Sequence, residues 1–250
     1  MKKMMTIIMA SLLSMGAMAA NTDTVTVRVK TMRCEDCGHK VRNALMKNPG
    51  VGAMEFNYER RTVKIAYDPQ KTDVDSIYRS IAVTKRYKAS PYSPTEVIRR
   101  GYGQHIADMH CQKCADRITK RLYQINGMDS LGVHLDKQWV FIRYDANKTC
   151  KAEIREALNA LNFTPVNYYT SDKIGFAYYN IPIEQATEEN IETIMAIDAV
   201  DDVNVNKRRK TMAITYFCQE ITADQLLEEI HKAGIKAEIP APHECKEESK

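Results

Sequence analysis

Cysteine, charge of one sign and long apolar runs are all scarce in this sequence. Seven cysteines in 250 residues are too sparse for the disulfide frameworks that stabilise chains of under about 100 residues. The 36 Lys and Arg residues nearly balance the 32 Asp and Glu residues, which argues against nucleic acid and anionic lipid as partners. Beyond the start of the chain, no apolar run approaches the roughly 20 residues of a transmembrane helix. We therefore expect a globular protein without membrane insertion, whose few cysteines need an explanation of their own.

The chain begins with the pattern of an export signal. Lys2 and Lys3 supply a positive start, Thr6 to Met15 an apolar stretch, and Ala17-Met18-Ala19 a cleavage site of small residues. The pattern predicts a cleaved signal peptide over residues 1–19 and a mature chain that is periplasmic or secreted. Cleavage would remove two lysines and no acid, so the formal net charge would fall from +4 to +2.

Two Cys-x-x-Cys pairs stand at matching places in an internal repeat. Cys34 and Cys37 recur 77 positions later as Cys111 and Cys114, and the two copies align without a gap from Met32 to Ile77. The shared positions include Val41 with Ile118, Leu45 with Leu122, Gly50 with Gly127, and Tyr67 with Tyr144. A repeat of this length can bury a core of its own, so we expect tandem domains rather than a stack of short repeats.

A third copy follows after a further shift of 72 positions, with the same apolar pattern but without the thiols. Leu122 falls on Ile194, Tyr144 on Tyr216, and Leu158 on Ile230, whereas Cys111 and Cys114 fall on Ile183 and Ala186. The third copy is therefore expected to keep the scaffold and to lack the site. It could serve docking, spacing or regulation.

The hydrophobic period changes in the same order within each copy. In the first copy Val25, Val27 and Val29 alternate with polar residues, as in a half-buried strand. The later segments are predicted as a helix over Cys37–Lys47, strands over Ala53–Tyr58 and Thr62–Tyr67, a helix over Val74–Ile81 and a strand over Tyr87–Tyr92. This order predicts an α+β fold of three tandem ferredoxin-like βαββαβ modules, each a four-stranded antiparallel sheet with two helices on one face.

The module boundaries follow from the linkers between these patterns. We expect the first module over residues 22–92, the second over 101–169 and the third, degenerate one over 174–239. Residues 240–250 are polar and without periodicity, so they are predicted to be a disordered tail. We expect the protein to be a monomer.

Each cysteine pair is predicted to lie in the loop between the first strand and the first helix, with the second cysteine opening the helix. The positive end of the helix dipole favours thiolate over thiol there, and thiolate is the form that binds metal. Two soft anionic ligands without a further nearby ligand suit Cu(I) best. Zn(II) normally takes four ligands, and one pair supplies two.

The segments Met32–Cys37 and Met109–Cys114 resemble the Met-x-Cys-x-x-Cys signature of heavy-metal-associated domains. That family includes copper chaperones, the tails of copper-pumping P-type ATPases and a periplasmic mercury-scavenging protein. The resemblance implies that Met32 and Met109 support the loop from inside the module. It also implies that Phe163, and Arg86 or Tyr87 in the first module, occupy the loop position that lies over the metal.

The chain departs from the copper members of the family at positions next to the thiols. Arg33 and His110 stand where those members usually carry Thr. Glu35 and Asp36 add negative charge to the first site and favour a divalent ion, whereas Lys113 does the reverse at the second. Zn(II), Cd(II) and Hg(II) therefore remain alternatives, and His110 is a candidate extra ligand for a divalent ion.

The sequence thus predicts a carrier or scavenger of a soft metal ion rather than an enzyme. The metal ligands would be Cys34, Cys37, Cys111 and Cys114, and the partners a metal-transporting membrane protein or a metallochaperone. Three alternatives stay open: structural disulfides, a thiol-disulfide redox protein, and an interaction scaffold with vestigial sites. Cys150 and Cys218 are expected to be partly buried small residues or bridge partners.

Overall fold

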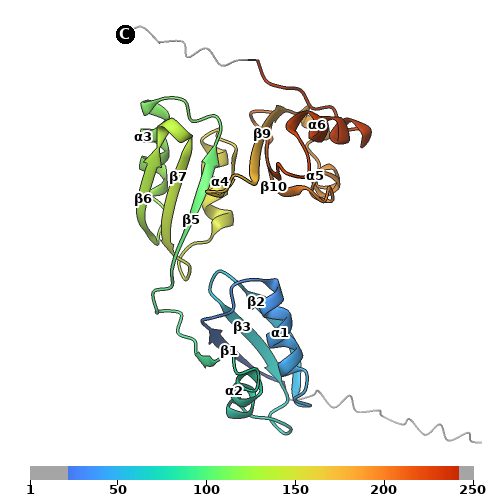
Figure 1. Cartoon of the computed structure of the whole chain (residues 1–250). Coiled ribbons are helices and arrows are strands. Elements are labelled where there is room, and N and C mark those ends of the chain that lie inside the picture. Colours follow the sequence, from blue (N-terminus) through green and yellow to red (C-terminus); the bar gives the residue numbers. More distant parts are fainter. Residues whose placement is uncertain (1–21, 242–250) are drawn as a thin grey trace, which may run out of the picture. The chain divides into compact units, whose positions relative to one another are not determined.

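The computed structural model describes residues 22–241. The predicted signal peptide and residues 242–250 of the predicted tail, with His243 and Cys245, lie outside this range. The chain divides after Tyr92 into two compact units. The first unit holds the first module, and the second unit holds the other two (Figure 1).

The first module is a four-stranded antiparallel sheet covered by two helices. Its elements are β1 (Asp23–Val29), α1 (Glu35–Leu45), β2 (Val51–Asn57), β3 (Thr62–Tyr67), α2 (Val74–Ala82) and β4 (Ala89–Pro91). The strand order is β2-β3-β1-β4, so β1 and β3 are central. This is the ferredoxin-like arrangement predicted from the sequence.

The alternation of apolar and polar side chains along β1 decides which face of the sheet is buried. Val27 and Val29 have no solvent exposure, and they belong to one core cluster with Leu45 of α1 and Ile81 of α2. Both helices therefore pack on the same face of the sheet. Burying a side chain of this size contributes about 1.5–3 kcal/mol.

The second module repeats the arrangement. Its elements are β5 (Arg99–Ile106), α3 (Gln112–Leu122), β6 (Met128–His134), the short helix η1 (Leu135–Lys137), β7 (Trp139–Asp145), α4 (Lys151–Ala160) and β8 (Pro165–Tyr168). The strand order is β6-β7-β5-β8. Strand β5 is preceded by linker residues that already pack on this module: Ile98 is fully buried, and its amide donates to the Asp145 carboxylate at 2.8 Å.

The third module keeps only part of the predicted sheet. Its elements are β9 (Ile174–Asn180), η2 (Ile183–Gln185), α5 (Glu188–Met195), β10 (Val200–Asn206), β11 (Thr211–Phe217) and α6 (Ala223–Lys232). The sheet has three strands in the order β10-β11-β9, and a single bridge between Asn180 and Glu238 stands where a fourth strand was expected. Pro240 has no N–H to continue that pairing, since proline cannot donate to a ladder.

A left-handed residue closes the central hairpin of every module. Arg61, Gln138 and Lys210 have φ angles of 55°, 53° and 58°. In each case the carbonyl accepts a backbone hydrogen bond from the end of the module's first strand, at Val29, Ile106 and Ile181. The third module therefore shares the hairpin geometry of the other two although it has lost the thiols.

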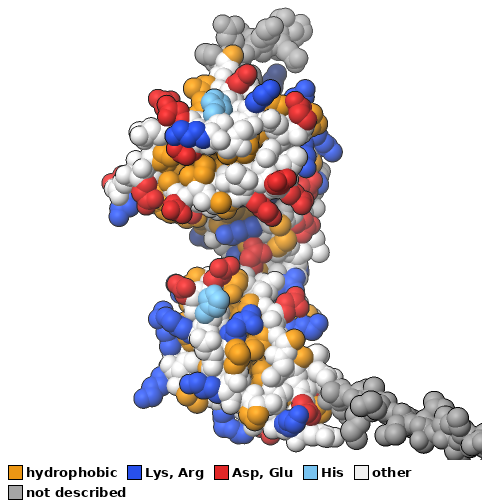
Figure 2. Space-filling model, turned by 90° about the vertical axis from the view of Figure 1, so that its right-hand side faces the viewer, with side chains coloured by type: hydrophobic (Ala, Val, Ile, Leu, Met, Phe, Trp, Pro, Cys, Tyr) orange, Lys and Arg blue, Asp and Glu red, His pale blue; other side chains and the backbone are white. Residues whose placement is uncertain are grey.

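Among the helices of residues 22–241, none combines the length and the apolar character needed to cross a membrane. On the face drawn in Figure 2, Lys and Arg side chains are interspersed with Asp and Glu side chains rather than gathered in one patch.

Candidate metal centre

The first thiol pair lies at the N-terminus of α1. Cys34 is the N-cap residue, with extended φ and ψ of −148° and 171°, and Cys37 lies in the first turn. The predicted helix start at Cys37 was therefore two residues late: the helix begins at Glu35, because acidic residues at positions 35 and 36 suit the positive end of a helix. The two sulfurs are 3.0 Å apart, so both face one point.

The two thiols of this pair differ in exposure and in acidity. Cys34 is exposed and Cys37 is buried. The pKa of Cys37 is lowered from 9.0 to about 6, chiefly by the Tyr87 hydroxyl and then by a backbone amide in the loop and by the Cys34 thiol. Cys37 therefore carries thiolate character at neutral pH, and thiolate is the metal-binding form.

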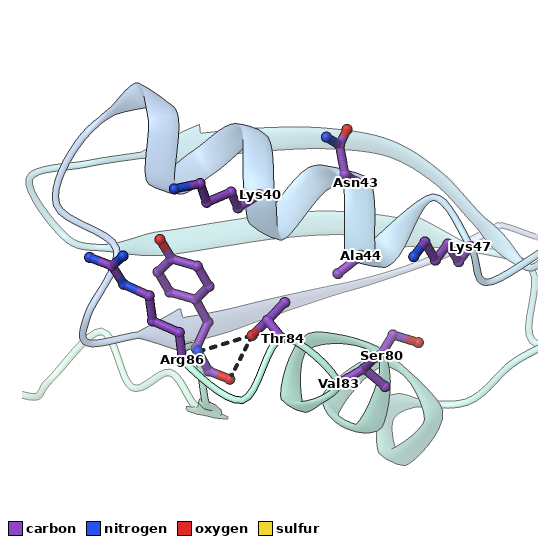
Figure 3. A pocket seen from close by; sticks show the side chains of 9 residues that line it. Lys40, Asn43, Ala44, Lys47, Ser80, Val83, Thr84 and Arg86 are labelled. Carbon is purple, nitrogen blue, oxygen red and sulfur yellow. Dashed lines mark hydrogen bonds between the residues drawn. The ribbon is translucent and has the colours of Figure 1, made fainter.

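Tyr87 reaches the thiol pair from the loop between α2 and β4. Its side chain is 1 % exposed, and within residues 22–241 its buried hydroxyl makes no regular hydrogen bond. The hydroxyl is near enough to Cys37 to lower the pKa of that thiol. The loop is fixed by Thr84, whose hydroxyl donates to the Ile81 carbonyl at 2.7 Å. The same hydroxyl accepts from the Tyr87 amide at 3.0 Å (Figure 3). Arg86 lines the groove of about 500 Å³ between α1 and α2 beside it.

Tyr58 is a neighbour of the first site that the sequence did not reveal. It follows β2, and its ring packs so closely on Gly38 that a Cβ there would lie 2.5 Å from the tyrosine oxygen. Burial raises the pKa of Tyr58, and Cys34 and Cys37 add to that rise. A glycine directly after the second cysteine was the available signal, since it permits close approach.

The two methionines of the signature lie beneath the loops. Met32 and Met109 have no solvent exposure. The Met32 amide donates to the Val29 carbonyl at 2.9 Å, and the Met109 amide to the Ile106 carbonyl at 3.0 Å. Each methionine therefore packs into the core at the turn that leads from the strand to the thiols.

The second thiol pair has the same backbone and a different electrostatic balance. Cys111 is the N-cap of α3, and its sulfur is 3.0 Å from that of Cys114. The Cys114 thiol lowers the pKa of Cys111, and Lys113 contributes to the same direction. Burial raises the pKa of Cys114 instead. The first cysteine of this pair is therefore the more acidic of the two, whereas in the first pair it is the second cysteine whose pKa is lowered.

Two loop residues of the second site are held in place by side chains from other elements. His110 is exposed, and its Nδ1 is 3.0 Å from the Gln138 amide nitrogen, which also donates to the Ala107 carbonyl at 2.8 Å. Phe163 is buried, and the Arg117 guanidinium lies 5.6 Å from its ring centre. Gln138 was not singled out from the sequence, because only the hairpin geometry brings it to His110.

Neither pair has a third protein ligand grouped with it. Within residues 22–241, three or more Cys, His, Asp or Glu side chains nowhere gather into a possible metal cluster. Cys150, at the N-cap of α4, is a partly buried free thiol, as expected. Cys218, after β11, is an exposed free thiol, so the expectation of a partly buried residue or a bridge partner was wrong there. Lys113, Glu35 and Asp36 lie in the first turns of their helices.

The third module has lost the loop as well as the thiols. Ile183, aligned with Cys111, is 54 % exposed in η2, and Ala186, aligned with Cys114, is 2 % exposed. Helix α5 begins only after Thr187, whose hydroxyl accepts from the Asn190 amide at 3.2 Å. Since Thr is a good N-cap, it sets a later start, and the turn that holds sulfur in the other modules does not form.

Comparison with known proteins gives consistent matches to one family. The model of the heavy-metal-associated domain matches residues 26–86 and 105–164. A copper-exporting P-type ATPase of Bacillus subtilis (strain 168) is 27 % identical over 139 residues, which is 56 % of this chain and 16 % of the ATPase. Copper-transporting ATPase 2 of Homo sapiens is 21 % identical over 175 residues, covering 60 % of this chain and 12 % of the ATPase. The chain thus spans a small part of the length of these relatives.

Solved structures are also among the matches. Oxidized MerP from Ralstonia metallidurans CH34 is 29 % identical, with a TM-score of 0.27, over 29 % of this chain and 99 % of that one.

Proposed function

Because residues 26–86 and 105–164 of this chain are heavy-metal-associated domains, we propose that the protein is an exported carrier or scavenger of a soft metal ion. Cys34 with Cys37, and Cys111 with Cys114, bind one ion per pair. Cu(I) is the favoured ion, and Zn(II), Cd(II) and Hg(II) are the alternatives. Metal-binding domains of this family are not catalytic, so the proposed role is binding and transfer.

The observation that carries the proposal is the convergence of two sulfurs at each helix N-terminus without a third donor. The sulfur–sulfur distance is 3.0 Å in both pairs, and among the described residues no larger ligand cluster exists. A two-thiolate site suits a soft ion of low coordination number. The similarity to copper-exporting ATPases supports Cu(I) over the other ions.

Transfer follows from the exposure of the sites. Cys34 is exposed, and Cys111 is partly exposed. A thiolate from a partner can therefore join the ion before one of the original sulfurs leaves, as in thiol exchange at a low-coordinate soft ion. The proposed partners are a metal-transporting membrane protein and a metallochaperone, and the proposed location is the periplasm or the exterior.

Titration of the reduced chain with Cu(I) against a competing chelator tests the proposal. We expect about two equivalents to bind, one per pair. Cys34→Ser with Cys37→Ser, and Cys111→Ser with Cys114→Ser, should each remove one equivalent, whereas Cys150→Ser should remove none. A reduced chain that retains no Cu(I), Zn(II), Cd(II) or Hg(II) at micromolar concentration would contradict it.

A thiol-disulfide redox role is the second candidate. It is favoured by the pKa of about 6 for Cys37, because a low thiol pKa increases the fraction of reactive thiolate. Reduction of insulin by dithiothreitol, with and without the protein, separates the two functions. A redox protein accelerates the reaction, and a metal carrier leaves its rate unchanged.

A further inference from the structure

The third module packs directly against the second one, beside its metal site. Its hairpin Asn206–Thr211, which joins β10 to β11, meets the C-terminal end of α4 and the loop that follows it. The contact is polar and buried: Asn206 and Thr211 are 2 % and 4 % exposed, and Thr164 of the second module is fully buried.

The hairpin holds the loop over residues 161–164. The Asn206 amide nitrogen donates to the Phe163 carbonyl at 2.8 Å and to the Asn159 carbonyl at 3.1 Å. Arg209 donates to the Asn162 carbonyl at 3.1 Å. Phe163 in turn packs under Arg117, one turn after Cys114 in α3.

The same hairpin also holds the other segment that borders the thiols. Asp108 lies three residues before Cys111 and is 4 % exposed. Its carboxylate accepts from the Thr164 amide and hydroxyl, both at 3.3 Å, and from the Tyr178 hydroxyl of the third module at 3.1 Å. Arg209 lies 3.7 Å from it. The thiol loop and the 161–164 loop are therefore joined to each other and to the third module.

The first module fastens the equivalent loop by itself. Lys85 and Asn162 occupy matching positions and share the left-handed conformation, with φ of 58° and 67°. In the first module the Thr84 hydroxyl bonds to the Ile81 carbonyl and to the Tyr87 amide. The matching residue in the second module is Leu161, which has no hydroxyl, so these two bonds are missing there. Within the second module the loop is held by Arg117, which donates to the Leu161 carbonyl at 3.1 Å, and by the Asp108–Thr164 bonds, and the third module adds the remaining bonds.

We propose that the third module is a brace that positions the second thiol pair. Asn206 and Arg209 hold the two segments between which Cys111 and Cys114 lie, and replace the hydroxyl that fixes the first site. This inference rests on the proposed metal binding for its biological use. It assigns the thiol-free module a role in setting the geometry of the second site.

The test uses the full chain with one thiol pair at a time. Cys34→Ser with Cys37→Ser leaves only the second pair, and Cys111→Ser with Cys114→Ser leaves only the first. Into each background we introduce Asn206→Ala with Arg209→Ala, or Arg209→Ala alone, whose side chain is 34 % exposed and therefore tolerant of change. Lys207→Ala, on the same turn and exposed, is the matched control.

Two readouts are compared. The first is the pH profile of alkylation of the reduced chain without metal, resolved by cysteine. The second is Cu(I) affinity against a competing chelator. We expect the brace variants to shift the profile of Cys111 and Cys114 and to weaken Cu(I) binding at that pair about tenfold, as loss of outer-shell partners does. The first pair and Lys207→Ala should not change.

An alkylation profile of Cys111 and Cys114 that is unchanged in both brace variants overturns the proposal, as does an equal change at the first pair. If neither pair of the parent chain binds Cu(I), the proposed function fails. The alkylation comparison still decides on the brace in that case, because it needs no metal.

Discussion

The Tyr87 hydroxyl makes the first thiol pair chemically different from the second. It is the largest cause of the lowered pKa of Cys37. The matching residue in the second module, Thr164, directs its hydroxyl to Asp108 instead. Cys114 therefore lacks such a donor, and burial raises its pKa. The sequence predicts a difference in metal preference from the charges of Glu35, Asp36 and Lys113, and of these Lys113 contributes to the lowered pKa of Cys111.

Replacing Tyr87 by Phe should raise the pKa of Cys37 from about 6 toward its ordinary value of 9.0. The hydroxyl stabilises the thiolate, so its removal favours the thiol. The folded-state pKa is the lower one, so the thiolate's contribution to stability is complete above the unfolded pKa and is lost as pH falls through about 6. The pH profile of Cys37 alkylation, followed by mass spectrometry, measures the shift.

Tyr78→Phe provides the control for this substitution, because Tyr78 lies in α2 and has no part in the pKa of Cys37. A Cys37 profile that moves to lower pH in Tyr87→Phe, or does not move, would show that another group holds the thiolate.

The residues of the site were only partly predictable. The four cysteines could be found because their spacing lies within one local segment. Tyr58 and Gln138 could not be found in this way, since each comes from a hairpin that is distant in the sequence. Tyr58 packs on Gly38, and Gln138 contacts His110. Gly38 signals a close approach but does not identify its partner. Contacts of that kind depend on strand register rather than on any local pattern.

At the scale of elements, cysteine replaces the usual N-cap residue in three helices. Cys34, Cys111 and Cys150 begin α1, α3 and α4 in extended conformation, and none of them makes a side-chain cap hydrogen bond. The helices α2, α5 and α6 instead have Asp73, Thr187 and Thr222 with capping hydrogen bonds. The two helices that carry the thiol pairs, α1 and α3, thus give up a stabilising cap to present sulfur.

Cys34→Ser should therefore stabilise the reduced first module by about 0.5–1 kcal/mol while abolishing its metal site, because Ser is a strong N-cap residue. Urea unfolding of the reduced chain without metal measures the first effect, and Cu(I) titration the second. Cys150→Ser is the matched control: it should add a similar cap to α4 without loss of bound metal. Equal or lower stability in both variants would contradict the capping argument.

The order of elements was predictable from the hydrophobic period, whereas the details of the third module were not. Its core positions follow the repeat, so the three strands and two helices form. The late start of α5 at Thr187 and the single bridge at Glu238 depend on one capping residue and on Pro240. Sliding the sequence against itself places Ile183 and Ala186 opposite the thiols, but it shows neither the late helix start nor the missing fourth strand.

At the scale of the whole molecule, the second and third modules share one interface within one compact unit. Arg155 of α4 donates to both carboxylate oxygens of Asp202 in β10, at 3.1 and 2.5 Å. The rings of His105 in β5 and Phe176 in β9 stack with centres 4.0 Å apart. The buried hairpin contacts add to these. Such an interface joins two folded cores and is expected to couple their unfolding.

Trp139, the one tryptophan of the chain, lies in β7 and reports on the second module. Ile230 lies in α6, is fully buried and belongs to the core cluster of the third module. Ile230→Ala should lower the free energy of unfolding by about 2–5 kcal/mol through the cavity it leaves. If the two modules unfold together, the urea midpoint followed by Trp139 fluorescence moves by the same amount as the midpoint followed by far-UV circular dichroism for this unit.

Asp198→Ala, an exposed change in the third module, should leave both midpoints in place. A Trp139 transition that stays fixed in Ile230→Ala while circular dichroism gains an earlier step would show that the third module unfolds alone and would contradict the coupling.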